Sequence, residues 1–279
     1  MRPADETTLD YLAVGHVTWD WKPEAGLAVG GTAAYAALTA QALGCRVGVV
    51  TRAAPDLDLA AALPGVQVVR APSPITTTFH NQHTPEGRRQ VLRAVAAPLG
   101  PDILPREWRT AHLLHLGPVA GECDPAWAAH FPAAFVGLTP QGWLRQWDAQ
   151  GHVGPAPWED AGPLLRRADA VVLSDEDAAG DGALVAAWAS QARVLALTRG
   201  AAGCTLFVAG EARQFDAFPA TEVDSTGAGD VFAAVFFVRL WRGDGPGAAA
   251  RWANCLAAAS VSRRGLAGVP TAAEVARCS

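Results

Sequence analysis

The stretch VDSTGAGDVFAAVFFVRLW, residues 223–241, joins a glycine-rich turn to a strongly apolar helix. At the start of that helix the backbone N–H groups of Gly227, Ala228 and Gly229 lack helical partners, and the helix dipole adds positive potential. The turn therefore predicts an anion-binding site. Asp230 follows in the first helical turn, where a carboxylate is also an ordinary stabilising residue. A carboxylate base beside a backbone anion hole is what phosphoryl transfer needs, so we predict that Asp230 activates a substrate hydroxyl.

The chain before this stretch alternates between apolar runs and alanine-rich segments. The apolar runs, each bounded by charge, Gly or Pro, are residues 11–17, 46–51, 113–117, 134–138, 170–174 and 194–198. The helical segments are residues 31–43, 57–63, 125–131, 160–168 and 183–191. This order predicts an α/β fold with a doubly wound, mostly parallel sheet flanked by helices. After residue 203 the rhythm changes, and we expect an antiparallel edge at 204–209 and 211–218, then helices near 228–242 and 246–263.

Two segments do not fit the alternation. Residues 18–29 and 73–95 place β-branched and aromatic residues around turn formers, as hairpin strands do. We expect them to form a small β lid over the carboxyl edge of the main sheet, inserted in a single domain that spans 1–279. Exposed lid strands invite pairing, so a homodimer through the lid is a further expectation.

Composition limits the class of protein. Half of the residues are hydrophobic and the net charge is −5, which favours an ordered globular protein and excludes nucleic acid as a partner. The polar start MRPADETTLD does not resemble a signal peptide, and no apolar run is long enough to span a membrane. Five widely spaced cysteines without a C-x-x-C pair predict reduced thiols. We therefore expect a soluble, cytoplasmic protein.

Residues 224–230, DSTGAGD, resemble the D-T-x-G-A-G-D motif of the ribokinase family, the phosphofructokinase B-type carbohydrate kinases. Four further segments resemble that family in the same order along the chain. They are GHVTWD at 15–20, the Gly-Gly pair at 30–31, Thr198-Arg-Gly200 with Gly203, and Trp252-Ala-Asn254. A single such segment is weak support, but five in the correct order cover nearly the whole chain.

The resemblance implies a ribokinase-like fold and a kinase that uses ATP and Mg²⁺. It assigns the base to Asp230 and the stabilisation of the transferred group to Gly227, Ala228 and Gly229. It places the acceptor against Asp20, Gly30 and Gly31, and the nucleotide against Thr198, Arg199, Gly200, Gly203 and Asn254. Asp224 is implied either as a ligand of a monovalent cation such as K⁺ or as the helix N-cap.

Two departures from the family pattern matter. Ser174-Asp-Glu-Asp177 stands where the family carries N-x-x-E, so Ser174 borders the nucleotide and Asp177 takes the place of the metal-linked Glu. A shorter carboxylate need not abolish Mg²⁺ binding, because this ion keeps several waters. Tyr35 replaces an Asn of the ribokinase subgroup, which argues against ribose as the acceptor.

Four segments resemble the plant-type myo-inositol kinase branch: Thr76–His80 with Arg88 and Arg89, residues 119–122, residues 139–145, and Trp147-Asp148. Within 139–145, Gln141 and Arg145 are implied as acceptor or phosphate contacts, and a structural role at the start of a helix is the alternative. Myo-inositol or a related polyol is therefore the first choice of acceptor, with another sugar, sugar acid or nucleoside as alternatives.

Two other classes of function stay open at this point. A catalytically weak nucleotide- or polyol-binding regulator is supported only by the altered Ser174–Asp177 segment. A dinucleotide-dependent oxidoreductase would need G-x-G-x-x-G after the first strand, but that strand ends in GHVTWD. The intact base and anion hole favour the kinase.

Overall fold

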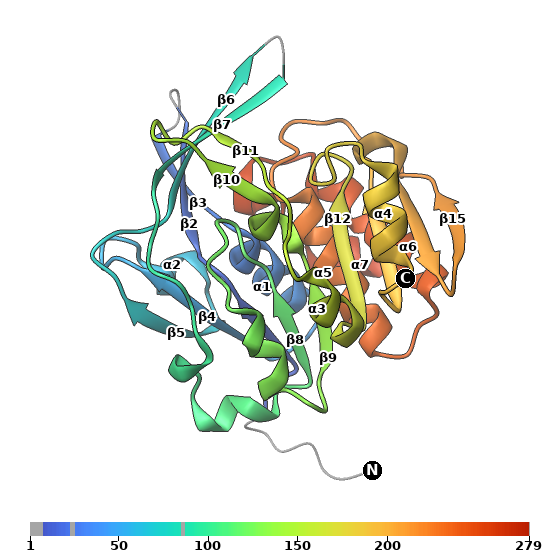
Figure 1. The fold of residues 1–279 in the computed structure, drawn as a ribbon, viewed down its shortest axis with the longest axis horizontal. Coiled ribbons are helices and arrows are strands. Elements are labelled where there is room, and N and C mark those ends of the chain that lie inside the picture. The colour runs from blue at the N-terminus through green and yellow to red at the C-terminus, as the bar shows by residue number, and fades with distance from the viewer. Residues whose placement is uncertain (1–7, 23–25, 85–86, 279) are drawn as a thin grey trace.

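The computed structural model describes residues 8–22, 26–84 and 87–278, without the side chains of Lys22 and of residues 82–84, 87 and 88. A nine-stranded sheet runs through the molecule in the order β15-β14-β13-β12-β9-β8-β1-β4-β5 (Figure 1). Its strands are β1 (Tyr11–Val14), β4 (Val47–Ala53), β5 (Gln67–Pro72), β8 (Leu113–Leu116), β9 (Phe135–Leu138), β12 (Ala170–Ser174), β13 (Val194–Thr198), β14 (Cys204–Val208) and β15 (Glu211–Phe215). All neighbours pair in parallel except β13–β14 and β14–β15, which are antiparallel.

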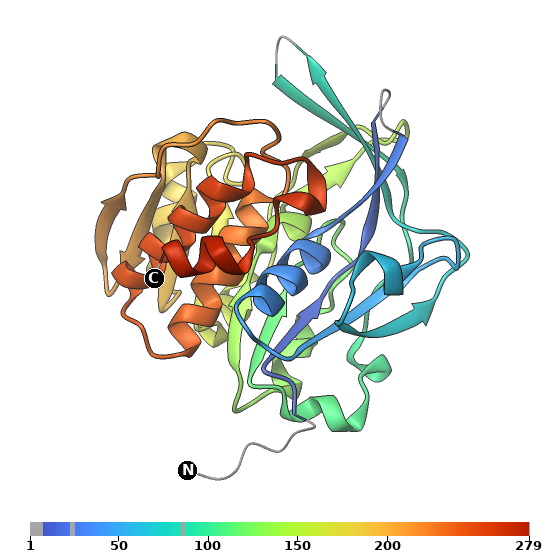
Figure 2. The same ribbon diagram turned by 180° about the vertical axis from the view of Figure 1, so that it is seen from behind.

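Helices cover both faces of this sheet. One face carries α1 (Thr32–Ala42), α5 (Ala228–Trp241), α6 (Pro246–Ser260) and α7 (Ala272–Arg277), which Figure 2 shows in front of the sheet. The opposite face, nearer the viewer in Figure 1, carries α3 (Ala161–Arg167) and α4 (Gly182–Ala189). The remaining helical elements are short: α2 (Leu59–Ala62) and the 3-10 turns η1 (Pro101–Ile103), η2 (Arg106–Thr110), η3 (Pro125–His130), η4 (Pro140–Leu144), η5 (Gly200–Ala202) and η6 (Gly265–Gly268).

The central strands are apolar throughout because both of their faces are buried. In β1, Tyr11 and Ala13 pack into the cluster under α1 and α5, whereas Leu12 and Val14 pack into the cluster on the other face. Side chains alternate between the two faces of a strand, so a short apolar run without polar interruption fills both layers. The doubly wound parallel sheet predicted from the sequence is thus confirmed.

A second, four-stranded sheet rises from the carboxyl edge of the main sheet (Figure 1). Its order is β3-β2-β6-β7, with β2 parallel to β6. The strands are β2 (Thr18–Lys22), β3 (Gly26–Gly30), β6 (Thr78–Thr84) and β7 (Gly87–Ala94), which fall in the two segments that the sequence singles out for lid strands.

Buried hydrogen bonds fix the base of this small sheet. His16, between β1 and β2, contacts the Thr77 hydroxyl through Nδ1 at 2.7 Å and the Ala97 carbonyl through Nε2 at 3.1 Å. The N–H of Val17 donates to the Thr51 hydroxyl at 2.8 Å. The small sheet is therefore anchored to the main sheet where β1 ends and β2 begins.

Several elements of the structure were not predicted from the sequence, α7 among them, and one expected α-helix is a 3-10 turn. The hairpin β10 (Arg145–Trp147) with β11 (Val153–Pro155) and the edge strand β5 were not predicted. Both are too short or too mixed in polarity for a clear period, and pairing with neighbours stabilises them. Residues 125–130 form a 3-10 turn, capped by Asp124 with Pro125 at its start.

The expectation that all five cysteines are reduced thiols is wrong for two of them. Cys255 in α6 and Cys278 after α7 form a disulfide, with their Cα atoms 6.0 Å apart. The two cysteines are 23 residues apart and form no recognisable cysteine motif, so the sequence did not predict the bond. The packing of α7 on α6 brings the two thiols together. Cys45, Cys123 and Cys204 are free and buried, as predicted.

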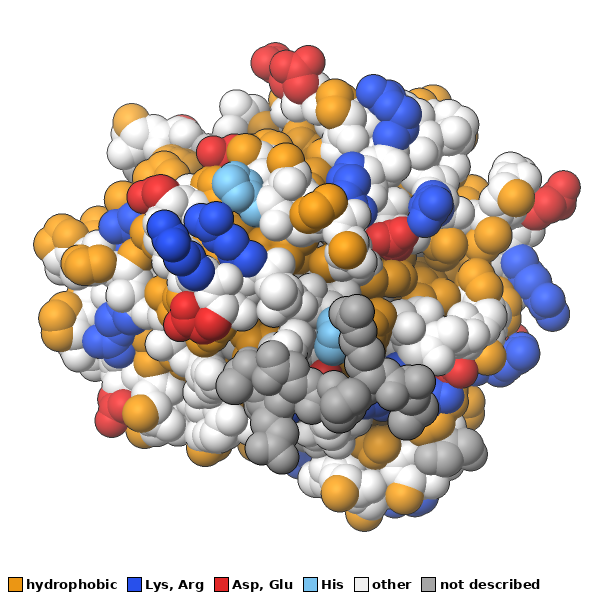
Figure 3. Space-filling model, turned by 90° about the horizontal axis from the view of Figure 1, so that it is seen from below, with side chains coloured by type: hydrophobic (Ala, Val, Ile, Leu, Met, Phe, Trp, Pro, Cys, Tyr) orange, Lys and Arg blue, Asp and Glu red, His pale blue; other side chains and the backbone are white. Residues whose placement is uncertain are grey.

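Figure 3 shows the end of the molecule opposite the small sheet, where acidic and basic side chains are interspersed with apolar ones. A hollow of about 580 Å³ lies at this end, by the amino ends of β8 and β9, and is lined in part by His112, Phe131 and Trp241. It is therefore at the opposite ends of the strands from Asp230. Within the described residues, no helix is long and apolar enough to cross a membrane.

Candidate active site

Most of the predicted site residues come from segments at the carboxyl edge of the main sheet. They follow β1, β9, β12 and β13 or stand at the starts of α1 and α5, whereas Asn254 lies within α6. The chain proceeds from β1 to β4 on one side, while β8 lies on the other side of β1. A crevice forms at such a change of direction, and open α/β sheets bind their ligands there. The topology thus brings Asp20, Thr32, Arg145 and Asp177 close to Asp230.

The turn at the start of α5 has the backbone that its glycine requires. Gly227 is the N-cap of α5 with φ of 81°, and no side chain caps the helix. A Cβ atom at Gly227 would lie 2.3 Å from the ring of Tyr35, so the turn packs directly on that ring. The N–H of Ala228 donates to the carbonyl of Ser225 at 3.2 Å. The predicted anion hole therefore rests chiefly on the N–H groups of Gly227 and Gly229.

Asp230 lies in the first turn of α5 and is half-buried. Burial raises the pKa of its carboxyl from 3.8 to about 6, although a hydrogen bond from the Thr32 side chain and the charge of Arg145 act against that rise. The carboxylates of Asp177 and Asp20 raise the pKa further. A carboxylate with a pKa near 6 is ionised at neutral pH and is a stronger base than an ordinary aspartate, as a general base should be.

Asp224 braces the turn from outside the helix. Its carboxylate accepts from the N–H of Thr226 at 3.0 Å and from the N–H of Gly265 at 3.2 Å. The N–H groups of Val223 and Asp224 both donate to the carbonyl of Val261. Because Gly227 is the N-cap, the alternative that Asp224 caps α5 is wrong.

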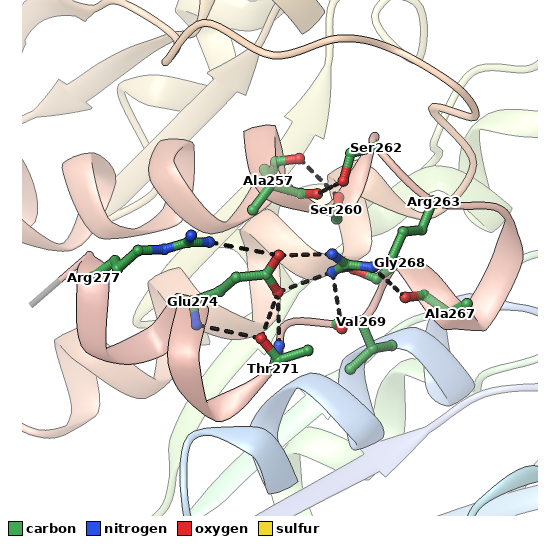
Figure 4. Close-up of polar contacts among 11 residues, drawn as sticks. Ala257, Ser260, Ser262, Arg263, Ala267, Gly268, Val269, Thr271, Glu274 and Arg277 are labelled. Carbon is green, nitrogen blue, oxygen red and sulfur yellow. Dashed lines mark hydrogen bonds and ion pairs between the residues drawn. The ribbon is translucent and has the colours of Figure 1, made fainter.

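Arg263 and Glu274 hold the segment that meets Asp224 (Figure 4). The Arg263 guanidinium pairs with the Glu274 carboxylate at 2.7 Å and 2.9 Å and donates to the carbonyl of Ala267 at 2.6 Å. Glu274 also accepts from the N–H and hydroxyl of Thr271, which closes a capping box at the start of α7. These bonds fold residues 263–274 into a compact support for η6, whose first residue, Gly265, donates to Asp224.

The acceptor side of the site is built on close backbone contacts. Asp20 on β2 is only 9% exposed, and a Cβ atom at Gly30 would lie 2.4 Å from its Oδ2. Gly31 has φ of 91°, and a Cβ there would lie 2.4 Å from the carbonyl oxygen of His16. The Gly-Gly pair is thus required for the Asp20 carboxylate to lie against the start of α1.

Ser174 and Asp177 form a closed turn after β12. The N–H and hydroxyl of Ser174 donate to Asp177 Oδ2 at 3.0 Å and 2.7 Å, and the Gln141 amide donates to Oδ1 at 3.1 Å. The hydrogen bond from Gln141 to Asp177 joins a residue that the sequence assigned to the acceptor or phosphate with one that it assigned to the metal. Arg145 is close enough to affect the pKa of Asp230, so the segment after β9 does reach the site.

The residues that resemble nucleotide contacts lie farther along the sheet, at β13, β14 and α6. Arg199 donates to the Thr205 hydroxyl at 2.5 Å. Gly203 has φ of 82°, and a Cβ there would lie 2.1 Å from the carbonyl oxygen of Phe215. The buried Asn254 amide donates to the carbonyls of Phe215 and Asp216 at 3.2 Å and 3.1 Å. Asn254 therefore shapes the loop after β15, whereas Thr198 ends β13 and Gly200 begins η5.

Sequence reasoning missed Thr32, which holds Asp230, because a threonine in an alanine-rich helix carries no signal of its own. Tyr35 was noted only as a departure from the ribokinase subgroup, and the structure adds that it packs under the Gly227 turn. The side chain of Arg88 lies outside the described residues, and Arg89 is exposed on β7.

The fold and the site agree with a match to a known protein family. Residues 167–272 match the pfkB family of carbohydrate kinases. A solved pyrophosphate-dependent kinase in the ribokinase family, complexed with a pyrophosphate analog and myo-inositol, has the same fold. The TM-score is 0.78 at 20% identity, covering 91% of this chain and 96% of that one.

Two curated relatives are inositol kinases. An inositol 3-kinase of Zea mays is 35% identical over 208 residues, which are 70% of this chain and 52% of that protein. An inositol 3-kinase of Oryza sativa subsp. japonica is 32% identical over 268 residues, which are 88% of this chain and 65% of that protein. The chain thus spans between about half and two thirds of the length of these relatives.

Proposed function

We propose that this protein is a kinase that transfers the γ-phosphate of ATP to a hydroxyl of myo-inositol or a related polyol, with Asp230 as the general base. The observation that carries the proposal is the Asp230 carboxyl, held by Thr32 beside the Gly227 turn with its pKa raised to about 6. Such a base takes the proton of the attacking hydroxyl, and the N–H groups of the turn offset the charge that spreads over the transferred group.

The choice of polyol rests on the relatives and on the small sheet. Asp20 and Phe79 are cross-strand neighbours, as are Phe79 and Leu92, so these side chains share one face of that sheet. Phe79 and Leu92 pack with Val119 and Ala120 into a separate apolar cluster. A carboxylate that accepts from ring hydroxyls, beside apolar surface for a ring face, suits a cyclic polyol. The sheet would act as a lid that excludes water, which competes as phosphoryl acceptor.

The Mg²⁺ that the family implies finds only a partial site in the protein itself. Within the described residues, no cluster of three or more His, Cys, Asp and Glu side chains is arranged to hold a metal. Asp177 already accepts from Ser174 and Gln141. It therefore fits a role toward the waters of an ion that arrives on the donor's phosphates. Bound there, Mg²⁺ would neutralise phosphate charge.

We further propose that K⁺ binds near Asp224. We also propose a homodimer through the small sheet, whose Trp21 and Leu27 are exposed.

The test is a phosphorylation screen with ATP or pyrophosphate as donor, with Mg²⁺ and with or without K⁺. The acceptors are myo-inositol, other inositols, ribose, fructose, 2-keto-3-deoxygluconate and a nucleoside. Pyrophosphate is included because the structural neighbour described above depends on it. We expect turnover with ATP, with an inositol as the best acceptor. Donor binding without turnover of any acceptor would favour a nucleotide- or polyol-binding regulator instead.

Asp230→Asn tests the base directly. Its amide still accepts from Thr32 but cannot take a proton, so we expect a loss of roughly 10²–10⁴ in kcat with donor affinity nearly unchanged. Asp175→Asn, on an exposed neighbour of the site, is the matched control and should keep full activity. Turnover of the Asp230 variant within a factor of two of the natural protein would rule out the assigned role.

A further inference from the structure

Three buried polar side chains form a chain across the middle of the main sheet, and the mechanism above uses none of them. The Tyr11 hydroxyl on β1 lies 2.6 Å from Nδ1 of His115 on β8. Nε2 of His115 lies 2.9 Å from the hydroxyl of Thr139, the first residue after β9. Tyr11 and His115 are at most 1% exposed, and Thr139 is 7% exposed.

The surroundings decide which ring nitrogen carries the hydrogen. Desolvation lowers the pKa of His115 to about 3, so the ring is neutral and has one donor and one acceptor. Within the described residues, the Tyr11 hydroxyl has no hydrogen-bond partner other than His115. If Nδ1 carried the hydrogen, the Tyr11 hydroxyl hydrogen would be buried in the apolar core without an acceptor, which is unfavourable. Tyr11 therefore donates to Nδ1, and Nε2–H donates to Thr139.

This direction leaves the Thr139 hydroxyl with a hydrogen to donate to another partner. Its oxygen already accepts from His115, so its own hydrogen must point elsewhere. A Cβ atom at Gly117 would lie 3.2 Å from Thr139 Oγ1 and 2.5 Å from Cγ2 of Thr32. Thr139 thus lies beside the residue that holds Asp230, and the Thr32 and Thr139 side chains pack closely over Gly117, where a side chain would not fit.

The part of the site that binds the polyol needs a hydrogen-bond donor. Asp20 and Asp230, when ionised, only accept hydrogen bonds, whereas a polyol hydroxyl both donates and accepts. Resting on the proposed polyol kinase function, we propose that Thr139 binds the acceptor by donating its hydroxyl hydrogen to a polyol oxygen. His115, held in turn by Tyr11, is the positioning residue that keeps this hydrogen directed at the site.

Kinetics of matched variants test the contact. Thr139→Val removes the hydroxyl at nearly constant volume and should lower kcat/KM for the best acceptor about tenfold, with KM for the donor within twofold. Thr139→Ser keeps the hydroxyl and should stay within about threefold of the natural protein. His115→Leu should lose about as much as Thr139→Val, and the double variant should lose no more than either. An unchanged kcat/KM in Thr139→Val would overturn the inference.

A spectroscopic readout separates positioning from mere packing. The ¹⁵N NMR shifts of the His115 ring, assigned with His115→Gln, should show hydrogen on Nε2 and none on Nδ1 in the natural protein. The opposite tautomer would overturn the inference even if His115→Leu were less active, since a packing defect alone does the latter. If the natural protein neither binds nor phosphorylates any polyol, both the proposed function and the inference fail. If it is active but indifferent to Thr139→Val, only the inference fails.

Discussion

The buried charge of Asp230 predicts that Asp230→Asn stabilises the protein at neutral pH while it removes activity. Raising the pKa of a carboxyl from 3.8 to about 6 costs the folded state about 3 kcal/mol once the group is ionised. The folded state binds the proton more tightly than the unfolded state, so stability rises as pH falls from about 6 toward 3.8. The cost is therefore fully present above pH 7 and absent near pH 4.

The assay is chemical denaturation of the natural protein, Asp230→Asn and the control Asp175→Asn between pH 4 and pH 8. Asp230→Asn should be more stable by up to about 3 kcal/mol at pH 8, and the difference should shrink to near zero at pH 4. Asp175 is exposed, so its variant should follow the natural protein at every pH. A gain that does not depend on pH, or no gain at pH 8, would refute the argument that the Asp230 charge is buried at a cost.

Three further predictions follow from single features of the structure. Activity should fall as pH drops through about 6, because protonation removes the base, and kcat/KM against pH should show this acid limb in the natural protein. Gly227→Ala should reduce kcat at least tenfold, because its Cβ would lie 2.3 Å from the Tyr35 ring and its φ is 81°. A Cβ at Gly229 would meet no neighbouring atom, so Gly229→Ala should leave the melting temperature unchanged. Equal melting temperatures of the two variants would contradict this prediction. Reducing the Cys255–Cys278 disulfide, or replacing both cysteines with serine, should lower the free energy of unfolding by about 2–4 kcal/mol. The measurement is denaturation with and without a dithiol reductant. Equal stability in both conditions would show that α7 stays docked without the disulfide.

Much of the fold follows from local pattern. Strands buried on both faces appear as short apolar runs, and the predicted runs 170–174 and 194–198 match β12 and β13 to the residue. Elements whose stability comes from their neighbours escaped prediction. The strand β5 and the β10–β11 hairpin carry no clear period, because pairing and packing at their positions stabilise them. The disulfide escaped for the same reason, since the docking of α7 on α6 is a tertiary event.

The sequence by itself determined the chemistry that is local to a turn or a strand end. The Gly227 turn, Asp230 and the Gly30-Gly31 pair could be recognised because glycine and carboxylate requirements are properties of a few consecutive residues. Only the tertiary structure decided what surrounds them. Thr32 reaches Asp230 from α1, and the pKa of that carboxyl rises because packed elements exclude water from it. His115 and Thr139 are 24 residues apart, and only the parallel pairing of β8 with β9 places their side chains within a hydrogen bond.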